Sequence, residues 1–97
     1  MPRFQDVDPR TLYLTPQRAA GADPWKLQQQ IVRYGASMTG MPPIWVCEDP
    51  DGRLQIQNGV TRATRIAKLS PGTLVRVEVT DILNKPIRFR VTIADVV

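Results

Sequence analysis

The spacing of apolar residues along the chain predicts an amphipathic helix over Pro24–Tyr34. Its apolar side chains recur at i, i+4 and i+7 and therefore share one helical face: Leu27, Ile31 and Tyr34. Asp23 and Pro24 are typical of a helix N-cap and a first helical position, and Gly35 is typical of a helix end. We therefore expect the helix to begin at Pro24 and to end at Tyr34.

A second helix is predicted from about Val60 to Leu69. Four small or apolar residues of this stretch share one helical face and are expected to pack on a sheet: Val60, Ala63, Ile66 and Ala67. Four polar residues share the opposite face: Thr61, Thr64, Arg65 and Lys68. Arg62 lies at the border of the two faces, one turn from the helix start. The sequence Ser70-Pro71-Gly72 ends the helix.

Alternation of apolar and polar residues predicts five strands. They are Thr11–Leu14, Ile44–Glu48, Arg53–Gln57, Thr73–Val79 and Ile87–Ile93. The turn sequence Asp49–Gly52 joins the second and third strands into a hairpin. Residues 1–10 are expected to form an N-terminal arm. The order of strands and helices predicts one α+β domain over residues 1–97, in which residues 81–97 add an extra C-terminal strand.

Composition excludes several classes of protein. The 97 residues suit one small domain. No apolar run approaches the ~20 residues that cross a bilayer, and residues 1–10 lack the apolar segment of a signal peptide, so we expect no membrane contact. Cys47 is the single cysteine, which suits the reducing cytoplasm. Because the chain has no histidine, Ser-His-Asp triads, Cys-His pairs and histidine-bound metals are excluded.

The excess of positive charge lies in the second half of the chain. Residues 1–50 hold five basic and five acidic side chains, whereas residues 51–97 hold eight basic and four acidic ones. This excess suggests an anionic partner, although basic surface that only aids solubility explains it equally well. Arg88 and Arg90, on the outward face of the last predicted strand, are candidate contacts to nucleic acid.

Candidate chemistry lies where the hairpin meets the second helix. Asn58 and Gly59 precede the helix start, where free N–H groups and the helix dipole favour anions. Glycine lets the backbone approach a ligand, Thr61 adds a hydroxyl, and Arg62 adds a planar fork that fits two phosphate oxygens. Arg65, one turn further on, is an additional candidate. The sequence therefore predicts a phosphate site at this turn.

A plainer interpretation of the same residues stays open. The turn is then an ordinary one, and Arg62 pairs with a carboxylate such as Glu78 or Asp81. Arg65 and Lys68 then belong to a solvated helix face. Helix starts that follow a glycine are common, so the spacing alone does not decide between the two interpretations.

The stretch IWVCEDPDGRLQIQNGVTRATRIAKL, followed by LVRVEV, resembles the core of the ParB/sulfiredoxin superfamily. In that family a hairpin strand ends in Asp/Asn-Gly, and two variable residues, an arginine and a helix follow. Upstream, the family has a helix that ends in glycine and a Pro-Ile-x-Val strand, matched here by residues 25–35 and 43–46. The resemblance covers about residues 7–80. It implies a small, curved, mixed sheet with two helices.

The resemblance also implies a nucleotide or phosphate site at the turn. Sulfiredoxins hold ATP there and the chromosome-segregation ParB proteins hold CTP, so the implied ligand is a nucleoside triphosphate, with or without magnesium. The residues that match by position are Asn58, Gly59, Thr61 and Arg62, with Gln17 and Arg18 as a looser match upstream.

Departures from the family pattern argue against catalysis. Sulfiredoxins place a catalytic cysteine and a histidine directly after the glycine, where this chain has Val60 and Thr61, and Cys47 lies in an earlier strand. The Gly-His-His-Arg and Gly-Glu-Arg-Arg motifs of other members are also missing. We therefore expect a binding module without catalytic residues and without a metal site. The alternatives are a DNA-binding accessory, a weak nuclease or nucleotide hydrolase, and a protein-interaction partner of the immunity type that has lost the ligand.

The remaining conspicuous residues are interpreted as structural. Trp25 and Trp45 are expected in the core, Trp45 above all because it lies in a strand, with base stacking as the alternative. Cys47 is expected to be a small buried residue. Asp49 and Asp51 fit the hairpin turn better than a metal site.

Overall fold

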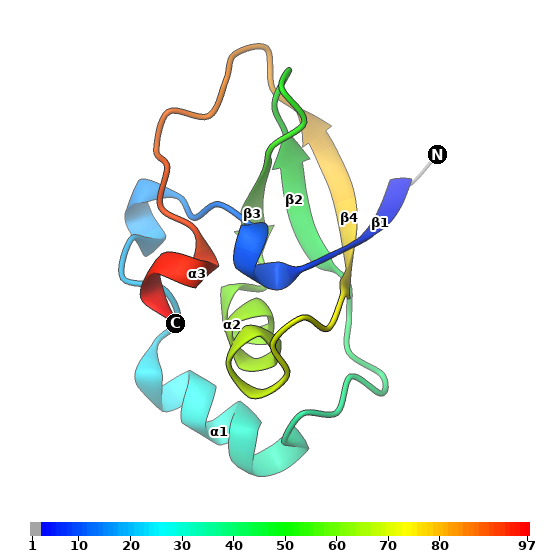
Figure 1. The fold of residues 1–97 in the computed structure, drawn as a ribbon, viewed down its shortest axis with the longest axis vertical. Coiled ribbons are helices and arrows are strands. Elements are labelled where there is room, and N and C mark those ends of the chain that lie inside the picture. Colours follow the sequence, from blue (N-terminus) through cyan, green and yellow to red (C-terminus); the bar gives the residue numbers. More distant parts are fainter. Residues whose placement is uncertain (1–2) are drawn as a thin grey trace.

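A computed structural model describes residues 3–97 of the chain as a four-stranded sheet with helix α2 (Val60–Leu69) packed against it and two further helices around α2 (Figure 1). The strands are β1 (Arg3–Val7), β2 (Ile44–Glu48), β3 (Leu54–Asn58) and β4 (Val75–Ile82). The helices are α1 (Pro24–Tyr34), α2 (Val60–Leu69) and α3 (Ile93–Val96), with 3₁₀ turns at Pro9–Thr11 and Pro16–Arg18. The predicted α+β class is therefore confirmed.

The sheet is mixed, with the strand order β1-β4-β2-β3. β4 pairs antiparallel with β1 and parallel with β2. β2 pairs antiparallel with β3, as the predicted hairpin requires. Parallel strands need a crossover connection, and here β3 and α2 carry the chain from the end of β2 back to the start of β4. The turn between β3 and α2 is therefore part of the crossover.

One hydrophobic core lies between the sheet and α2. The strands contribute Val46, Ile56 and Val77, and α2 contributes Ala63 and Ile66, all of which are buried. The apolar face predicted for α2 is thus the face that packs on the sheet. This packing fixes the direction in which the first turn of α2 points.

Helix α1 begins and ends where its sequence predicts. The Oδ1 atom of Asp23 accepts a hydrogen bond from the N–H of Trp25 at 2.8 Å, and Gly35 ends the helix with a φ of 56°. α1 packs against α2 on the side away from the sheet (Figure 1), and none of its residues is buried. Among the helices of residues 3–97, none is long and apolar enough to cross a membrane.

The predicted N-terminal arm is wrong, because residues 3–7 form the edge strand β1. It runs antiparallel to β4, with Phe4 opposite Glu78 and Val7 opposite Val75. Three of its five residues are exposed. Because a strand so little buried needs no regular alternation of apolar and polar residues, its sequence shows no strand signal. Residues 1–2 of the predicted arm lie outside the described residues.

The predicted strand Thr11–Leu14 is also wrong. The 3₁₀ turn Pro9–Thr11 takes up its start, and the remaining residues are too few for a strand. Tyr13 forms isolated β-bridges with Gln55 of β3 and with Thr92. The leucines on either side of Tyr13 are fully buried, so the apolar pattern reflected burial rather than a strand.

The predicted last strand, Ile87–Ile93, does not form, and neither does the extra C-terminal strand expected over residues 81–97. Residues 87–91 belong to no strand or helix, Thr92 forms an isolated bridge, and Ile93 begins α3. The predicted inward and outward positions are nevertheless right, since Ile87 is buried whereas Arg88 and Arg90 are exposed. The backbone of this segment pairs with residues 12–14 through two hydrogen bonds near its end, of 2.8 and 3.0 Å. The three-residue partner is too short to support a regular strand.

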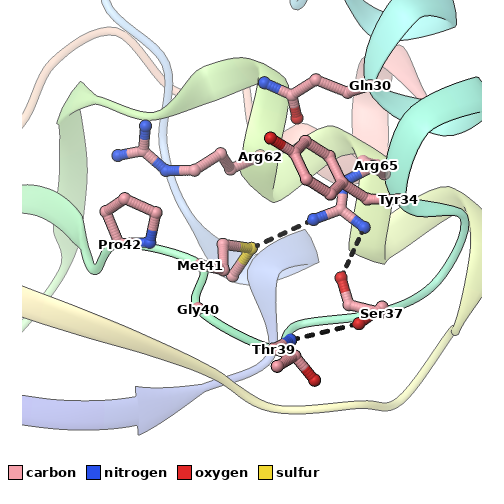
Figure 2. Close-up of a pocket in the computed structure, with 9 residues that line it drawn as sticks. All are labelled: Gln30, Tyr34, Ser37, Thr39, Gly40, Met41, Pro42, Arg62 and Arg65. Carbon is pink, nitrogen blue, oxygen red and sulfur yellow. Dashed lines mark hydrogen bonds between the residues drawn. The ribbon is translucent and has the colours of Figure 1, made fainter.

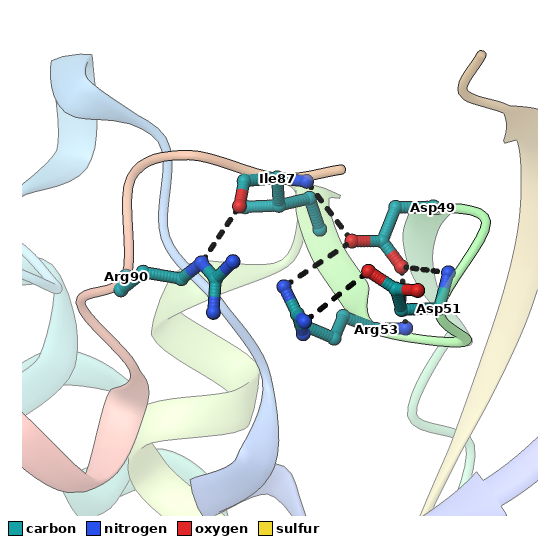
Figure 3. Close-up of polar contacts among 5 residues, drawn as sticks. All are labelled: Asp49, Asp51, Arg53, Ile87 and Arg90. Atoms are coloured by element: carbon teal, nitrogen blue, oxygen red, sulfur yellow. Dashed lines mark hydrogen bonds and ion pairs between the residues drawn. The ribbon is translucent and has the colours of Figure 1, made fainter. Parts of the chain in front are cut away.

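Asp49 ties this C-terminal segment to the hairpin (Figure 3). Its Oδ1 atom accepts hydrogen bonds from the N–H groups of Asp51 and Arg53, at 2.9 and 2.8 Å. Its Oδ2 atom accepts one from the N–H of Ile87 at 2.9 Å. Asp49 is buried, and it is a turn residue, as predicted, that also anchors a distant segment.

Both tryptophans are largely exposed, so the prediction that they lie in the core is wrong. The exposed fraction is 70 % for Trp25 and 48 % for Trp45. Trp45 follows the buried Ile44 in β2 and points to the sheet face that α2 does not cover, in register with Glu78 and Asn58 of the neighbouring strands. A strand covered by a helix on one face only exposes alternate residues.

Candidate functional site

The predicted turn is the start of α2. Gly59 is its N-cap, with φ 110° and ψ 22°, and the helix begins at Val60. The carbonyl of Gly59 accepts the N–H of Ala63 at 2.9 Å, which closes the first helical turn. Gly59 has no side chain that could cap the helix, and within residues 3–97 no other side chain accepts a hydrogen bond from the first N–H groups of α2, which leaves these donors for a ligand. The predicted switch from strand to helix is confirmed.

A cavity of about 490 Å³ lies beside this turn. Six of the residues singled out in the sequence line it: Gln17, Arg18, Asn58, Gly59, Thr61 and Arg62. Helix α1 contributes Lys26 and Gln30 to the lining. The fold therefore places Gln17 and Arg18, the looser match to the family, and one face of α1 beside the turn.

The cavity is positively charged. Arg18, Lys26 and Arg62 line it, and no acidic side chain does. Across residues 3–97, none of these three side chains forms an ion pair with a carboxylate. The alternative interpretation, in which Arg62 pairs with Glu78 or Asp81, is therefore wrong. The positive charge of the cavity is not neutralised by a neighbouring carboxylate.

Arg62 is held in place by the backbone. Its Nη2 atom donates to the carbonyl of Pro43 at 3.1 Å, and its guanidinium lies against Gly59. Its Nε atom is buried and has no hydrogen-bond partner among the described residues. Burial lowers the pKa of Arg62 below its ordinary value, although an arginine stays protonated at neutral pH. Arg62 therefore brings a partly desolvated positive charge to the cavity wall.

Arg65 does not line this cavity, and its predicted place on a solvated helix face is wrong. Arg65 and its neighbour Thr64 are both buried. The Nη1 atom of Arg65 donates to the carbonyls of Gly35 and Ser37 at 2.7 and 2.8 Å. Its guanidinium also stacks on the ring of Tyr34 (Figure 2). The end of α1 and the loop after it thus cover the part of α2 that the helical pattern alone leaves exposed.

Arg88 and Arg90 do not line the cavity at the turn. Both are exposed, and the Nε atom of Arg90 donates to the carbonyl of Ile87 at 2.7 Å (Figure 3). Because this segment is not a strand, the predicted basic strand face does not exist. The two arginines have no regular scaffold that would aim them at a common ligand.

Lys26 and Gln30 of α1 line the cavity although the sequence did not indicate them as site residues, and the same holds for Thr15, Ile56, Gln57 and Val60. Lys26 and Gln30 stand four residues apart on α1, so they share one face of that helix. The i, i+4 spacing was a usable signal, but no sequence pattern says which face of α1 meets the turn. That information comes from the packing of α1 on α2.

Cys47 is buried, as expected, and is 3 % exposed. Burial raises the pKa of its thiol, and the charge of Asp81 raises it further, although Gln57 donates to the sulfur at 3.1 Å. A raised pKa keeps the thiol protonated and unreactive. Within the described part of the chain, no three cysteine, aspartate or glutamate side chains gather where they would hold a metal ion.

The site thus combines a glycine turn, a helix start and three basic side chains from three segments of the chain. This combination suits an oxyanion, which accepts hydrogen bonds from N–H groups and neutralises the cations. Comparison of the chain with protein-family models, with curated proteins and with solved structures gave no match. The resemblance to the ParB/sulfiredoxin superfamily therefore stays a prediction.

Proposed function

We propose that this chain is a binding module that holds a phosphate group of a nucleotide or of a nucleic acid at the Gly59–Arg62 turn. The observation that carries the proposal is the cavity beside the turn, which three basic side chains and no acidic side chain line. The uncapped N–H groups of α2 and the fork of Arg62 add directional hydrogen bonds. A bound phosphate supplies the negative charge that the cavity lacks.

The size of the cavity supports a ligand up to a nucleotide. Its volume of about 490 Å³ falls within the range of about 300–1,000 Å³ that is usual for small-molecule sites. Either ATP or CTP is therefore a reasonable probe. Because no carboxylate lines the cavity, a magnesium ion would be held by the phosphates of the ligand rather than by the protein.

The proposed function is binding without catalysis. The chain has no histidine, and the lining of the cavity holds neither an acidic side chain nor a cysteine that would serve as base or nucleophile. Thr61 is the residue of the turn with a hydroxyl, and no base beside it lines the cavity. A lone buried cysteine suits a reducing compartment, so we keep the cytoplasm as the proposed location.

Titration with inorganic phosphate, ATP and CTP, with and without magnesium, tests the proposal. A ligand that binds the folded chain raises its melting temperature. Arg18→Gln and Lys26→Gln each remove an exposed cation without an ion pair, so we expect weaker binding and an unchanged melting temperature of the free protein. Lys85→Gln, a matched exposed cation that does not line the cavity, is the control. No response to any probe, or an equal effect of Lys85→Gln, would contradict the proposal.

Single-stranded nucleic acid is favoured over a free nucleotide by one observation. Trp25 is 70 % exposed and directly precedes Lys26 in α1, outside the lining of the cavity, and exposed aromatic rings stack with bases. Nucleic-acid binding predicts quenching of tryptophan fluorescence by an oligonucleotide, loss of that quenching in Trp25→Leu, and affinity that falls steeply with salt. A DNA-binding accessory would instead lose affinity in Arg88→Gln. A pure protein-interaction partner would respond to neither probe.

A further inference from the structure

A second cavity, of about 240 Å³, lies between α1, α2 and the loop over residues 37–42 (Figure 2). Arg62 and Gln30 line both this cavity and the one beside the turn, so the two share a wall. The remaining lining includes Arg65, Tyr34 and Thr39. The second cavity is smaller than the usual small-molecule site of about 300–1,000 Å³, so it suits one chemical group rather than a whole nucleotide.

Two guanidinium groups and no carboxylate line this second cavity. Arg65 is 2 % exposed, which is exceptional for an arginine without an ion pair. In the range 3–97 neither Arg62 nor Arg65 has a carboxylate partner. Buried charges in proteins are normally paired, because the loss of hydration is otherwise uncompensated.

The backbone compensates only part of the charge on Arg65. Its Nη1 atom donates to the carbonyls of Gly35 and Ser37, at the negative end of the α1 dipole. Its Nη2 atom donates to the sulfur of Met41, which is a weak acceptor, at 3.4 Å. Its Nε atom is buried without a partner in the described part of the molecule. The guanidinium therefore keeps donor capacity and a full positive charge.

Two other polar atoms in the residues that line this cavity are also buried without a hydrogen-bond partner. The Nε atom of Arg62 and the Oε1 atom of Gln30 are buried and lack hydrogen-bond partners within residues 3–97. Buried polar atoms in folded proteins are almost always hydrogen-bonded, so a cluster of exceptions around one cavity calls for an explanation. An oxyanion accepts from both arginines, and a protonated oxygen or an accompanying water donates to Gln30.

We propose that the cavity between α1, α2 and the 37–42 loop is a second anion site, which takes one carboxylate or phosphate group on Arg65 and Arg62. The ring of Tyr34 lies on the guanidinium of Arg65, at 5.4 Å to its centroid, and holds its plane fixed. The site adjoins the turn and shares Arg62 and Gln30 with the cavity there, but its lining includes neither Gly59 nor Thr61. Its remaining lining comes from the 37–42 loop, from Tyr34 at the end of α1 and from Arg65 of α2.

A purely structural role is the competing explanation for Arg65, in which it only fastens the end of α1 to the loop. Thr39 separates the two explanations, because its exposed side chain lines the cavity. Thr39→Glu places a carboxylate beside the arginines, so we expect a melting temperature several degrees higher and loss of anion binding. Thr39→Gln has the same size without the charge, and we expect it to change neither. Equal melting temperatures for the two variants would overturn the proposal.

The binding experiment uses acetate and inorganic phosphate as probes, at constant ionic strength, with backbone amide NMR as the readout. We expect saturable shifts of the Thr39 and Gly40 amides, whereas the Gly59 and Thr61 amides report on the turn. Stronger binding of acetate indicates a carboxylate ligand, and stronger binding of phosphate indicates a phosphorylated one.

Arg65→Lys keeps the charge but loses the fork, so the affinity at Thr39 and Gly40 is expected to fall by about tenfold, with the turn amides unaffected. Shifts confined to the turn would overturn the second site and leave the proposed function intact. Shifts confined to the Thr39 and Gly40 amides would support the second site and contradict the proposed function.

Discussion

The guanidinium of Arg62 occupies the space where residue 59 would carry a side chain. A Cβ atom on Gly59 would lie 2.9 Å from Arg62 Nη2 and 3.1 Å from Ile44 Cγ1. Gly59 also has a φ of 110°, a backbone conformation that other residues rarely adopt. Glycine is thus needed at this turn for two reasons, its backbone angle and the room it leaves for the arginine.

Gly59→Ala is expected to destabilise the fold and to displace Arg62. The backbone strain alone costs about 1–2 kcal/mol of unfolding free energy, and the contact with Arg62 adds to it. Urea denaturation measures the cost. Gly52→Ala is the matched control, because Gly52 also has a positive φ, of 83°, but its added Cβ would have no neighbour within 4 Å. A cost for Gly59→Ala no larger than that for Gly52→Ala would show that the space for Arg62 does not matter.

Arg62→Ala is expected to weaken the binding of a phosphate ligand without unfolding the chain. A charge-assisted bidentate contact contributes about 1.5–3 kcal/mol, so affinity should fall on the order of tenfold to a hundredfold. Losing the bond to Pro43 should cost about 1 kcal/mol of stability. Calorimetric titration with the ligand that binds best, beside thermal melting, measures both effects. A sharply lower melting temperature with unchanged affinity would assign Arg62 a structural role instead.

Helices α1 and α2 were predictable because their signals are local, whereas α3 was not predicted. The Asp23 cap and the Gly35 stop both lie within one residue of α1, and the pattern that begins after Gly59 gave the bounds of α2. The residues of the turn were predictable for the same reason, since they follow one another in the sequence. A search for such signals needs no knowledge of the tertiary fold.

The elements that were missed depend on contacts between distant segments. Strand β1 has a polar sequence and exists because β4 offers it an edge. Arg65 is buried because the loop after α1 folds over it, although its helical position alone suggests solvent. Lys26 joins the cavity through the orientation of α1 on α2. The spacing of apolar residues predicts which face of a segment is buried, but it does not predict which other segment will cover that face.

The carboxylate of Asp49 makes stability depend on pH in the acid range. Burial alone raises the pKa of Asp49, but the N–H groups of Ile87, Arg53 and Asp51, with the charge of Arg53, outweigh it and hold the pKa below the ordinary value of 3.8. The ionised carboxylate therefore stabilises the folded chain above the pKa of the unfolded state. That stabilisation is lost as the pH falls from about 4 through the lower folded pKa.

Asp49→Asn is expected to lower the melting temperature by several degrees at neutral pH, because the N–H of Ile87 loses its charged acceptor. The variant should also show a weaker loss of stability between neutral pH and pH values below about 4 than the parent chain. Denaturant midpoints across this range measure both effects. Asp51→Asn, in the same turn but with an exposed carboxylate, is the control. Equal pH profiles for the two variants would contradict the role assigned to Asp49.

Cys47 is expected to be structural and chemically inert. Burial raises the pKa of its thiol, so the reactive thiolate is scarce near neutral pH. Thiol reagents should therefore label the folded chain slowly and the urea-unfolded chain fast. Cys47→Ser should cost near the lower end of about 1–3 kcal/mol, because Gln57 remains as a partner for the new hydroxyl, and it should leave phosphate binding unchanged. Rapid labelling of the folded chain would contradict the burial of the thiol and reopen the comparison with sulfiredoxins.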